Sequence, residues 1–422
     1  MKIRTLTMLT VVAMIAILLA LTPGQARAAA TTRWVNAVDP NGGGYAPPGT
    51  SCNDPGYPTI QSAVTAAVSG DTIRVCAGTY VEQVKIDKSL TLKGEDDKSV
   101  IKAPSSMLPD ADGKTNIVEI TGASTSVDAS HLAVAGPMPV CGDSGIAIID
   151  GAKLAINHAA VRNIGPAVPT SACVAGEGIR AGTQRNSATA RVGHLVAKNV
   201  EVTGYNRSGI VIAGSGSTGD LDHNTVATGP SPSTFTLPQN GIVVGGVGVA
   251  AGAVLSADHN SVRGNHCNYI VSGQCGSDFV NDVQSGGILL YDAGSGVSLA
   301  HNELTDNDIG IYVTGGAGAG LDTNVVFDHN KANENRYVGI FFDTGATNPT
   351  VSHNDTKKNG QYGIYLGSTT GGPYGGIGGL FVDNDAKDNP TFDLWWDGQG
   401  TPTFNKNHCS TAFPSKAAWD CK

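Results

Sequence analysis

A short glycine-led unit repeats along the chain and constrains its fold more than any other feature. Each copy is a glycine followed by alternating apolar residues, as in Gly310-Ile-Tyr-Val. The copies start at Gly145, Gly209, Gly241, Gly287, Gly310, Gly339 and Gly363, with a weaker copy at Gly178. The last four starts are separated by 23, 29 and 24 residues, a period typical of solenoids. One unit cannot bury its Ile, Val and Leu side chains alone, but stacked coils bury them against one another.

An asparagine follows a short strand in the same coils, often directly after a histidine. These asparagines are Asn224, Asn260, Asn302, Asn330, Asn354 and Asn384, and five of the six have another asparagine five residues later, at Asn265, Asn307, Asn335, Asn359 and Asn389. Asparagine tolerates the left-handed backbone of a sharp corner, and stacked asparagines can pass hydrogen bonds between coils. Helix-forming patterns are nearly absent after residue 70. We therefore predict an all-β fold, a single-stranded right-handed parallel β-helix, over residues 71–390.

Both ends of such a solenoid need covering, because an open coil exposes its core and strand edges. Within the N-terminal segment 29–70, one helical face is apolar at Ile60, Ala63, Val64 and Ala67, which predicts a helical cap on the first coil. Residues 391–422 are expected to form a C-terminal capping segment. Trp395, Trp396 and Trp419 lie in this segment, where we expect them to cover the open core.

Residues 1–28 have the pattern of a cleaved signal peptide. Lys2 and Arg4 precede an apolar run from Leu9 to Leu21, and Ala26-Arg27-Ala28 matches a small-residue cleavage site. The run is short and wrongly flanked for a membrane span, so we expect an extracellular or envelope-associated protein with no stable span after cleavage. Cleavage removes three basic and no acidic residues, which takes the formal charge from −9 to −12. Such a charge argues against nucleic acid and against an unassisted polyanionic substrate.

The eight cysteines are even in number, and no two are arranged as a CxxC pair that would indicate a zinc knuckle. With an export signal, disulfide bonds are the natural interpretation. Pairing sequence neighbours gives the simplest prediction, which is Cys52–Cys76, Cys141–Cys173, Cys267–Cys275 and Cys409–Cys421.

The stretch from Tyr57 to Ile101 carries Thr-Ile-Gln-Ser-Ala-Val, Gly-Asp-Thr-Ile, Gly-Thr-Tyr-Val-Glu and Leu-Thr-Leu-Lys-Gly. This stretch is similar to the N-terminal coil of pectin methylesterases and of periplasmic copper-associated NosD-like proteins. Together with the later glycine and asparagine repeats, it resembles the pectin-lyase-like superfamily of right-handed β-helix proteins over nearly all of the mature chain. The resemblance implies the fold and not the activity, since one fold hosts many activities.

The catalytic motifs of related enzyme families are missing from the sequence. The only Asp-Asp is Asp96-Asp97, and the Asn-Thr-Asp, Gly-His-Gly and Arg-Ile-Lys of polygalacturonases do not occur. The pectin methylesterase Gly-Thr-Val-Asp-Phe-Ile-Phe-Gly, the pectate lyase Arg-x-Pro-x-x-Arg and the alginate epimerase Asp-Pro-His are also absent. No catalytic residue is carried over from these families.

The outward face of the glycine-led strands is the best candidate surface. Positions one and three after each glycine should point inward, so positions two and four should point outward. The aromatic residues at outward positions are Tyr291, Tyr312, Phe341 and Tyr365. Such a ladder could stack on sugar rings, or it could be a stabilising stack under a loop or an oligomer contact.

Asp292 and Asp343 lie at the ends of two of these strands and are the candidate catalytic pair. Two coils apart, they would be separated by about 10 Å, near the spacing of inverting glycosidases. They could instead be turn-corner residues. No cofactor is required, but calcium binding by these acids, or by Asp306 and Asp308, is possible because clustered oxygens suit that ion.

A histidine column is the second chemical feature. His223, His259, His301, His329 and His353 each precede a ladder asparagine, and His301, His329 and His353 are the candidate metal ligands. Imidazoles about 5 Å apart suit copper or zinc. A solvated stack is the alternative that we favour, because a linear column lacks ligands converging from other directions. Glu177 and Arg180 are expected to form an exposed ion pair.

These observations favour a secreted β-helix protein that binds polysaccharide or cell-surface glycan along its outer face, with hydrolase or lyase activity possible. The first alternative is a non-catalytic structural or adhesive surface protein. The second is a NosD-like metal-handling protein.

Overall fold

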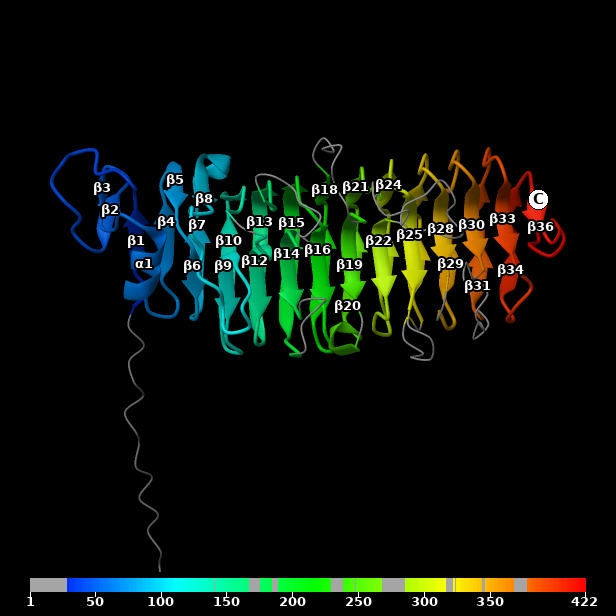
Figure 1. Ribbon diagram of the computed structural model, residues 1–422, viewed down its shortest axis with the longest axis horizontal. Helices are drawn as coiled ribbons and strands as arrows, with labels where there is room; N and C mark the ends of the chain where they lie inside the picture. The colour runs from blue at the N-terminus through cyan, green and yellow to red at the C-terminus, as the bar shows by residue number, and fades with distance from the viewer. Residues whose placement is uncertain are drawn as a thin grey trace, which may run out of the picture.

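The computed structural model describes residues 29–139, 141–166, 175–183, 189–228, 238–246, 248–267, 285–315, 322, 324–343, 346–367 and 378–422. In these ranges the chain winds as one long stack of coils from the N-terminal to the C-terminal end (Figure 1). Its strands form three faces, and the strands of each face pair in parallel with those of the neighbouring coils.

The first face is built from β1 (Thr32–Val35), β4 (Thr72–Val75), β7 (Leu90–Lys93), β10 (Ser126–Ser130), β13 (Ala152–Arg162), β15 (Gly193–Thr203), β17 (Thr218–Asp222), β20 (Val254–Asp258), β23 (Ser298–Ala300), β26 (Val326–Asp328), β29 (Thr350–Ser352), β31 (Leu380–Val382) and β34 (Thr403–Asn405). The second face contains β5 (Gly78–Val81), β8 (Ser99–Lys102), β11 (Ala133–Ala135), the later halves of β13 and β15, β18 (Thr225–Ala227), β21 (Ser261–Arg263), β24 (Glu303–Thr305), β27 (Lys331–Ala332), β32 (Asp385–Ala386) and β35 (His408–Cys409).

The third face is one twelve-stranded sheet, with the strands in chain order. It contains β6 (Val84–Ile86), β9 (Asn116–Thr121), β12 (Ser144–Ile149), β14 (Glu177–Gly182), β16 (Ser208–Ala213), β19 (Asn240–Gly245), β22 (Gly286–Tyr291), β25 (Ile309–Thr314), β28 (Val338–Phe342), β30 (Tyr362–Leu366), β33 (Phe392–Trp396) and β36 (Ala412–Phe413). Two short 3₁₀ helices, η1 (Asp96–Lys98) and η2 (Gly248–Ala250), lie in connections.

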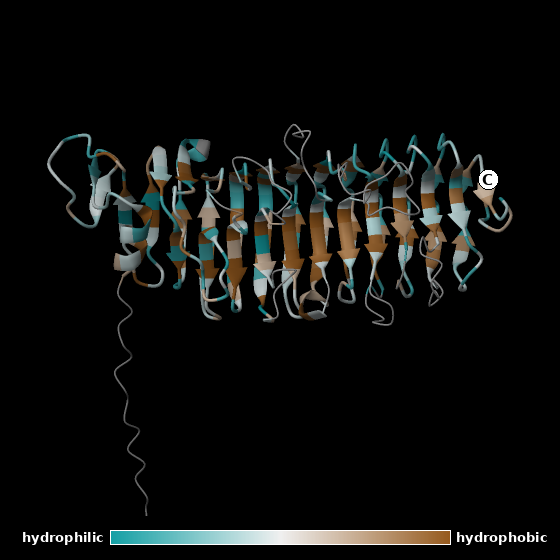
Figure 2. Ribbon diagram, viewed as in Figure 1, coloured by the Kyte–Doolittle hydropathy of each residue, from teal (hydrophilic) through white to brown (hydrophobic). Residues whose placement is uncertain are grey.

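A single apolar core fills the inside of the coils from Val35 to Trp419. In β25, Ile311 and Val313 belong to this core, whereas Tyr312 packs in a separate cluster outside it. The same alternation recurs along the third face, and Figure 2 shows its strands as mainly hydrophobic. The inward and outward positions are therefore confirmed, because the two-residue period of a strand fixes them.

Two asparagine ladders run along the corners of the stack. The first joins Asn224, Asn260, Asn302, Asn330, Asn354, Asn384 and Asn407, and the second joins Asn265, Asn307, Asn335, Asn359 and Asn389. Within each ladder, a side-chain Nδ2 donates to the Oδ1 of the next asparagine, for example over 2.9 Å from Asn302 to Asn330. The predicted coil-to-coil hydrogen bonding is confirmed.

The left-handed corner residue is the one before each ladder asparagine, and not the asparagine itself as the sequence suggested. His259 and His301, for example, have φ values of 54° and 52°. The asparagine side chain is committed to the ladder, so the preceding residue takes the corner conformation and its side chain stays near solvent. The histidine column therefore follows directly from the geometry of the ladder.

A short helix, α1 (Ile60–Ala66), occupies the segment where one was predicted. Thr59 caps its N-terminus by accepting from the Ser62 N–H, and Ile60, Ala63 and Val64 are buried. The helix contacts β1, β4 and β6 at the N-terminal end of the stack (Figure 1). Its function as a lid stays a prediction. An antiparallel pair, β2 (Gly49–Ser51) and β3 (Asp54–Pro55), lies nearby.

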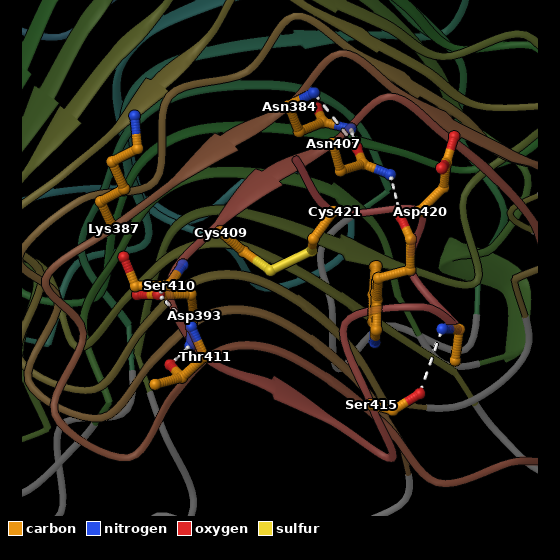
Figure 3. Close-up of a disulfide and its surroundings, with 12 residues drawn as sticks. Asn384, Lys387, Asp393, Asn407, Cys409, Ser410, Thr411, Ser415, Asp420 and Cys421 are labelled. Atoms are coloured by element: carbon orange, nitrogen blue, oxygen red, sulfur yellow. Dashed lines mark hydrogen bonds between the residues drawn. A yellow bond between two sulfur atoms is a disulfide. The ribbon is translucent and has the colours of Figure 1, made fainter.

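The C-terminal segment contains the last coil and a disulfide between Cys409 and Cys421 (Figure 3). Trp419 is fully buried against Phe381 and Phe404, so this indole fills the end of the core as expected. Asn407 continues the first ladder and donates to the Trp419 carbonyl oxygen over 3.1 Å.

The disulfides Cys52–Cys76 and Cys409–Cys421 are formed as predicted. Cys141 and Cys267 are also disulfide-bonded. Their predicted partners, Cys173 and Cys275, lie outside the described residues, as does the signal-peptide segment 1–28. Among the described residues, no helix has the length and apolar character needed to cross a membrane.

Candidate functional site

The outer row of the third face changes in chemistry along the stack. In register from the N-terminal end it runs through Lys85, Glu119, Ala147, Arg180, Val211, Val243, Leu289, Tyr312, Phe341, Tyr365, Trp395 and Phe413. The row is polar first, aliphatic in the middle and aromatic at the end. Parallel pairing brings these residues together although they are far apart in the sequence.

The aromatic part forms the predicted ladder, with two of its rings more buried than expected. The Tyr312 and Phe341 ring centroids are 5.0 Å apart and stacked, and those of Tyr365 and Trp395 are 4.2 Å apart. Phe341 is 1 % exposed and Tyr365 is 6 % exposed, in a cluster that also includes Tyr337. The expectation that these two rings face solvent is wrong, because other side chains of the same chain pack over them.

At the corner where the third face leads into the first, Asp343 approaches β25. Its Oδ2 accepts from the Tyr312 hydroxyl over 3.0 Å and from the Thr314 hydroxyl over 3.3 Å. Burial and the nearby Asp343 carboxylate raise the pKa of Tyr312, so the phenol stays neutral and donates. Asp343 itself is 6 % exposed.

Asp292 lies at the same corner, one coil earlier than Thr314. Its N–H donates to the Thr314 carbonyl oxygen over 3.2 Å, and its φ of 49° places it in the left-handed region. A Cβ added to Gly315 would come within 2.3 Å of the Asp292 Oδ1, so the carboxylate needs a glycine beside it. Asp292 and Asp343 therefore approach the same short segment, Thr314–Gly315, from neighbouring coils. Both were predicted as site residues from the sequence, and their catalytic role stays a prediction.

Asp322 is a third carboxyl group at this corner, and sequence reasoning missed it. It is 1 % exposed, and its Oδ1 accepts from the Ala293 N–H over 3.0 Å. Its Oδ2 is buried and has no hydrogen-bond partner among the described residues. Burial, opposed by the Ala293 hydrogen bond and reinforced by the Asp292 carboxylate, raises the pKa of Asp322 to about 8. Asp322 therefore holds a proton at neutral pH beside a second acid.

We call Asp292, Asp322 and Asp343 the acid corner. It combines one protonated carboxyl group with other carboxyl groups at the end of strands that carry Tyr291 and Tyr312. Such an arrangement can accept hydrogen bonds from hydroxyl groups and can also donate a proton. The low exposure of all three acids fits groups that act where water is excluded.

The other acids considered for calcium, Asp306 and Asp308, are already engaged. His266 lies 3.3 Å from each of them, through Nε2 to Asp306 and Nδ1 to Asp308. Asp308 is fully buried and also accepts from the Cys267 N–H over 2.7 Å. The hydrogen bond to Asp308, against the opposing effect of burial, raises the pKa of His266. A calcium ion here would compete with the His266 imidazole for both carboxylates, so the pair fits a structural role better.

The five histidines of the predicted column are stacked on successive coils. The rings of His223, His259, His301, His329 and His353 stack with centroid separations of 4.8, 4.7, 5.3 and 4.6 Å in that order. Aspartates beside them, at positions 222, 258 and 328, supply the converging ligands that a linear column alone would lack.

Glu177 and Arg180 form a buried ion pair, which corrects the expectation of an exposed one. The Arg180 Nε lies 3.3 Å from the Glu177 Oε2, and the side chains are 2 % and 3 % exposed. Arg180 also donates to the Ser144 hydroxyl and to the Gly182 carbonyl oxygen over 3.1 and 2.7 Å. Burial, opposed by the Arg180 charge, raises the pKa of Glu177. Arg180 lies in the outer row of the third face, but both side chains of the pair are buried.

An open groove of about 340 Å³ crosses the outer side of β7, β10, β13 and β15 on the first face. Thr91, Asp128, Asn157 and Lys198 are among its lining residues. No aromatic residue lines it. The groove was not predicted, because it depends on which neighbouring outward side chains are small, such as Ala155 between Asp128 and Val196.

Comparisons with known proteins agree with this architecture. The family model described as right handed beta helix region matches residues 184–374. The chain is similar to the Dettilon tailspike protein gp208, with a TM-score of 0.57 at 15% identity over 84% of this chain and 63% of that one. It is also similar to the Agl-KA catalytic domain, with a TM-score of 0.49 at 13% identity over 84% and 61% of the two chains.

A third similar structure is the Azotobacter vinelandii mannuronan C-5 epimerase AlgE4 A-module, with a TM-score of 0.46 at 14% identity over 83% and 82% of the two chains. The chain thus spans less than two thirds of the tailspike chain and of the Agl-KA domain. A search of curated proteins by similarity gave no match. The chain folds as a right-handed parallel β-helix, as predicted from the sequence.

Proposed function

We propose that this chain is an exported β-helix protein that binds polysaccharide at the acid corner and along the adjoining outer face. The observation that carries the proposal is that Asp292 and Asp343 both approach Thr314, with Asp322 beside Asp292. Carboxylates accept hydrogen bonds from sugar hydroxyls, and the neighbouring Tyr291 and Tyr312 supply apolar ring surface of the kind that sugar faces contact.

The charge of the chain limits the kind of polysaccharide. The expected mature charge of −12 repels polyanions, so a neutral glycan is favoured, or an acidic glycan bridged by calcium. The disulfides Cys52–Cys76 and Cys409–Cys421 support export to an oxidising compartment, where glycans are the available polymers.

Catalysis is a second candidate, favoured by the raised pKa of Asp322. A carboxylic acid that keeps its proton at neutral pH, next to another carboxyl group, is the pairing by which glycosidases protonate a leaving oxygen. In this mechanism Asp322 would donate the proton, and Asp292 or Asp343 would act as base or nucleophile. A hydrolase or lyase acting on polysaccharide is the reaction class that fits.

The test is a glycan array with the purified mature protein, with and without calcium, followed by a search for new reducing ends or unsaturated products. We expect binding that falls at least tenfold in Asp292→Asn and Asp343→Asn. Asp150→Asn is the matched control, because Asp150 is also a left-handed residue following a third-face strand but interacts with Thr121 and Arg191 instead.

Binding that survives both acid-corner substitutions but is lost in Asp128→Asn would indicate that the glycan binds in the groove on the first face. No binding to any glycan would favour the alternative of a structural or adhesive protein. The burial of Phe341 and Tyr365 within their own chain argues against a partner docking on the aromatic ladder. A sedimentation experiment that finds only monomers would exclude the hypothesis of self-association through that face.

A further inference from the structure

The histidine column is paired with carboxylates in a repeating way. The Asp258 Oδ1 lies 3.1 Å from the His259 Nδ1 and 3.0 Å from the His301 Nδ1. Asp328 repeats the arrangement, with 2.9 Å to the His329 Nδ1 and 2.9 Å to the His353 Nδ1. Each carboxylate therefore faces the same ring nitrogen of two histidines on neighbouring coils.

The pairing arises because, in both groups, the residue before the second histidine is small. Asp258 is in register with Ala300, and Asp328 is in register with Ser352. The small residue on the second coil leaves room for the carboxylate of the first coil to reach both imidazoles. One coil earlier the column differs, because Asp222 is in register with Asp258 and two like charges lie beside each other there.

The fold fixes each histidine in two ways, through its own backbone conformation and through the asparagine that follows it. His259, His301, His329 and His353 are left-handed corner residues with φ between 52° and 54°. The asparagine after each one is fixed in the ladder, so the imidazoles repeat with the spacing of the coils. Each histidine side chain remains about half exposed, at 47 to 51 %. Solvent ligands and ions can thus reach it.

Donor atoms in each group all lie within 4.8 Å of one another. A transition metal bonded to nitrogen and oxygen at about 2.0–2.2 Å needs donors about 3–4 Å apart. A small rotation of exposed side chains closes that gap. Imidazole nitrogen with carboxylate oxygen is a donor set that suits Zn²⁺ and Cu²⁺.

We propose that Asp258–His259–His301 and Asp328–His329–His353 each bind one divalent transition-metal ion through two Nδ1 atoms and one carboxylate oxygen. On binding, the ion replaces the proton that each Nδ1 shares with the carboxylate, and water completes the coordination.

A third group, Asp222–His223–His259, shares His259 with the Asp258 group. One imidazole Nδ1 cannot bind two ions, so the Asp222 group and the Asp258 group together hold one fully ligated ion. The expected capacity is therefore two ions for each chain, and not three. This sharing makes the effects of single substitutions predictable.

The experiment is calorimetric titration of Zn²⁺ into the full mature chain, purified without a histidine tag and stripped with chelator. Histidine is replaced by asparagine, which tolerates the left-handed corner. We expect two ions for the native chain, one for His259→Asn and one for His353→Asn, and none for the double variant. His301→Asn should still bind two ions, because His259 can then be a ligand of the ion in the Asp222 group.

His131→Asn is the matched control. His131 also has a left-handed φ, of 56°, and stacks on His158 at 5.4 Å, but it belongs to none of the metal-competent groups among the described residues. It should keep both ions. A Cu²⁺ electron paramagnetic resonance spectrum with hyperfine splitting from two nitrogens for each ion would support the ligand set.

Three outcomes would overturn the proposal. The native chain could bind less than one ion, the His259→Asn/His353→Asn double variant could keep its ions, or His131→Asn could lose as much as the site variants. Circular dichroism on every variant separates loss of a ligand from loss of the fold.

Discussion

The protonation of Asp322 can be tested by replacing it with asparagine. Asparagine keeps the oxygen that accepts from the Ala293 N–H and has nearly the shape of a neutral carboxylic acid. It cannot ionise. Any difference in the pH dependence of stability between the native chain and Asp322→Asn therefore belongs to this one group and to groups coupled to it.

The direction and size of the pH effect on stability follow from the pKa values of Asp322 in the unfolded and in the folded chain. In the unfolded chain Asp322 loses its proton near the ordinary value of 3.8, whereas in the folded chain it keeps the proton up to about pH 8. Between these values the folded state binds one more proton than the unfolded state, so stability falls as pH rises. The slope is about 1.4 kcal/mol for each pH unit. From pH 5 to pH 7 the native chain should lose about 3 kcal/mol relative to the variant.

The assay is urea unfolding of both proteins at pH 5, 6 and 7, followed by circular dichroism. The stabilisation present below pH 4 should be lost progressively as pH rises toward 8, and only in the native chain. Parallel pH profiles for the two proteins would mean that Asp322 is ionised in the folded state. In that case the acid corner holds no proton to donate, and the proposed catalysis fails while glycan binding remains testable.

Three further substitutions test the packing of the solenoid in the same unfolding assay. Asn302→Ala should cost about 2–5 kcal/mol, because it removes hydrogen bonds in the first ladder and leaves the buried Asn260 N–H without its acceptor; a change below 1 kcal/mol would contradict the ladder's role. Phe341→Ala should cost about 3–5 kcal/mol, since the ring is buried, and a near-neutral result would mean that the ring is exposed in solution. Cys409→Ser with Cys421→Ser should lower stability by about 2–3 kcal/mol through the loss of the 12-residue crosslink, and an unchanged midpoint would show that the last coil is held by packing alone.

The coils could be predicted from the sequence because the repeat encodes them directly. The glycine-led units set the third face. The first asparagine ladder sets the corner between the first and second faces, and the second ladder sets the corner between the second and third faces. Local signals of this kind need no knowledge of distant contacts. The helix at Ile60–Ala66 and the two disulfides whose cysteines both lie in the described residues were also predictable, from an apolar face and from sequence proximity.

The acid corner was only half predictable. Asp292 and Asp343 follow repeating strands, so their place relative to each glycine revealed them. Asp322 lies in no repeat, in a glycine-rich stretch, and only the three-dimensional structure brings it to Ala293. Its raised pKa depends on burial, which a one-dimensional pattern does not encode.

Exposure was the least predictable property of the outer face. The direction of Phe341 and Arg180 follows from strand alternation, but whether another part of the chain covers them does not. The aspartates beside the histidine column were visible in the sequence as Asp-His-Asn at 222, 258 and 328. Their pairing with two imidazoles became apparent only once the register placed Asp258 beside Ala300.

Because of the asparagine ladder, whole coils can be removed or added. Asn330 and Asn354 occupy equivalent places 24 residues apart, and each has the same hydrogen bonds to the coils before and after it. Joining His329 directly to Asn354 would remove one whole coil. Every remaining ladder asparagine would still have an equivalent neighbour. The length of the rod can therefore change in steps of about 4.8 Å through duplication or loss of short gene segments, without redesign of the parts that stay.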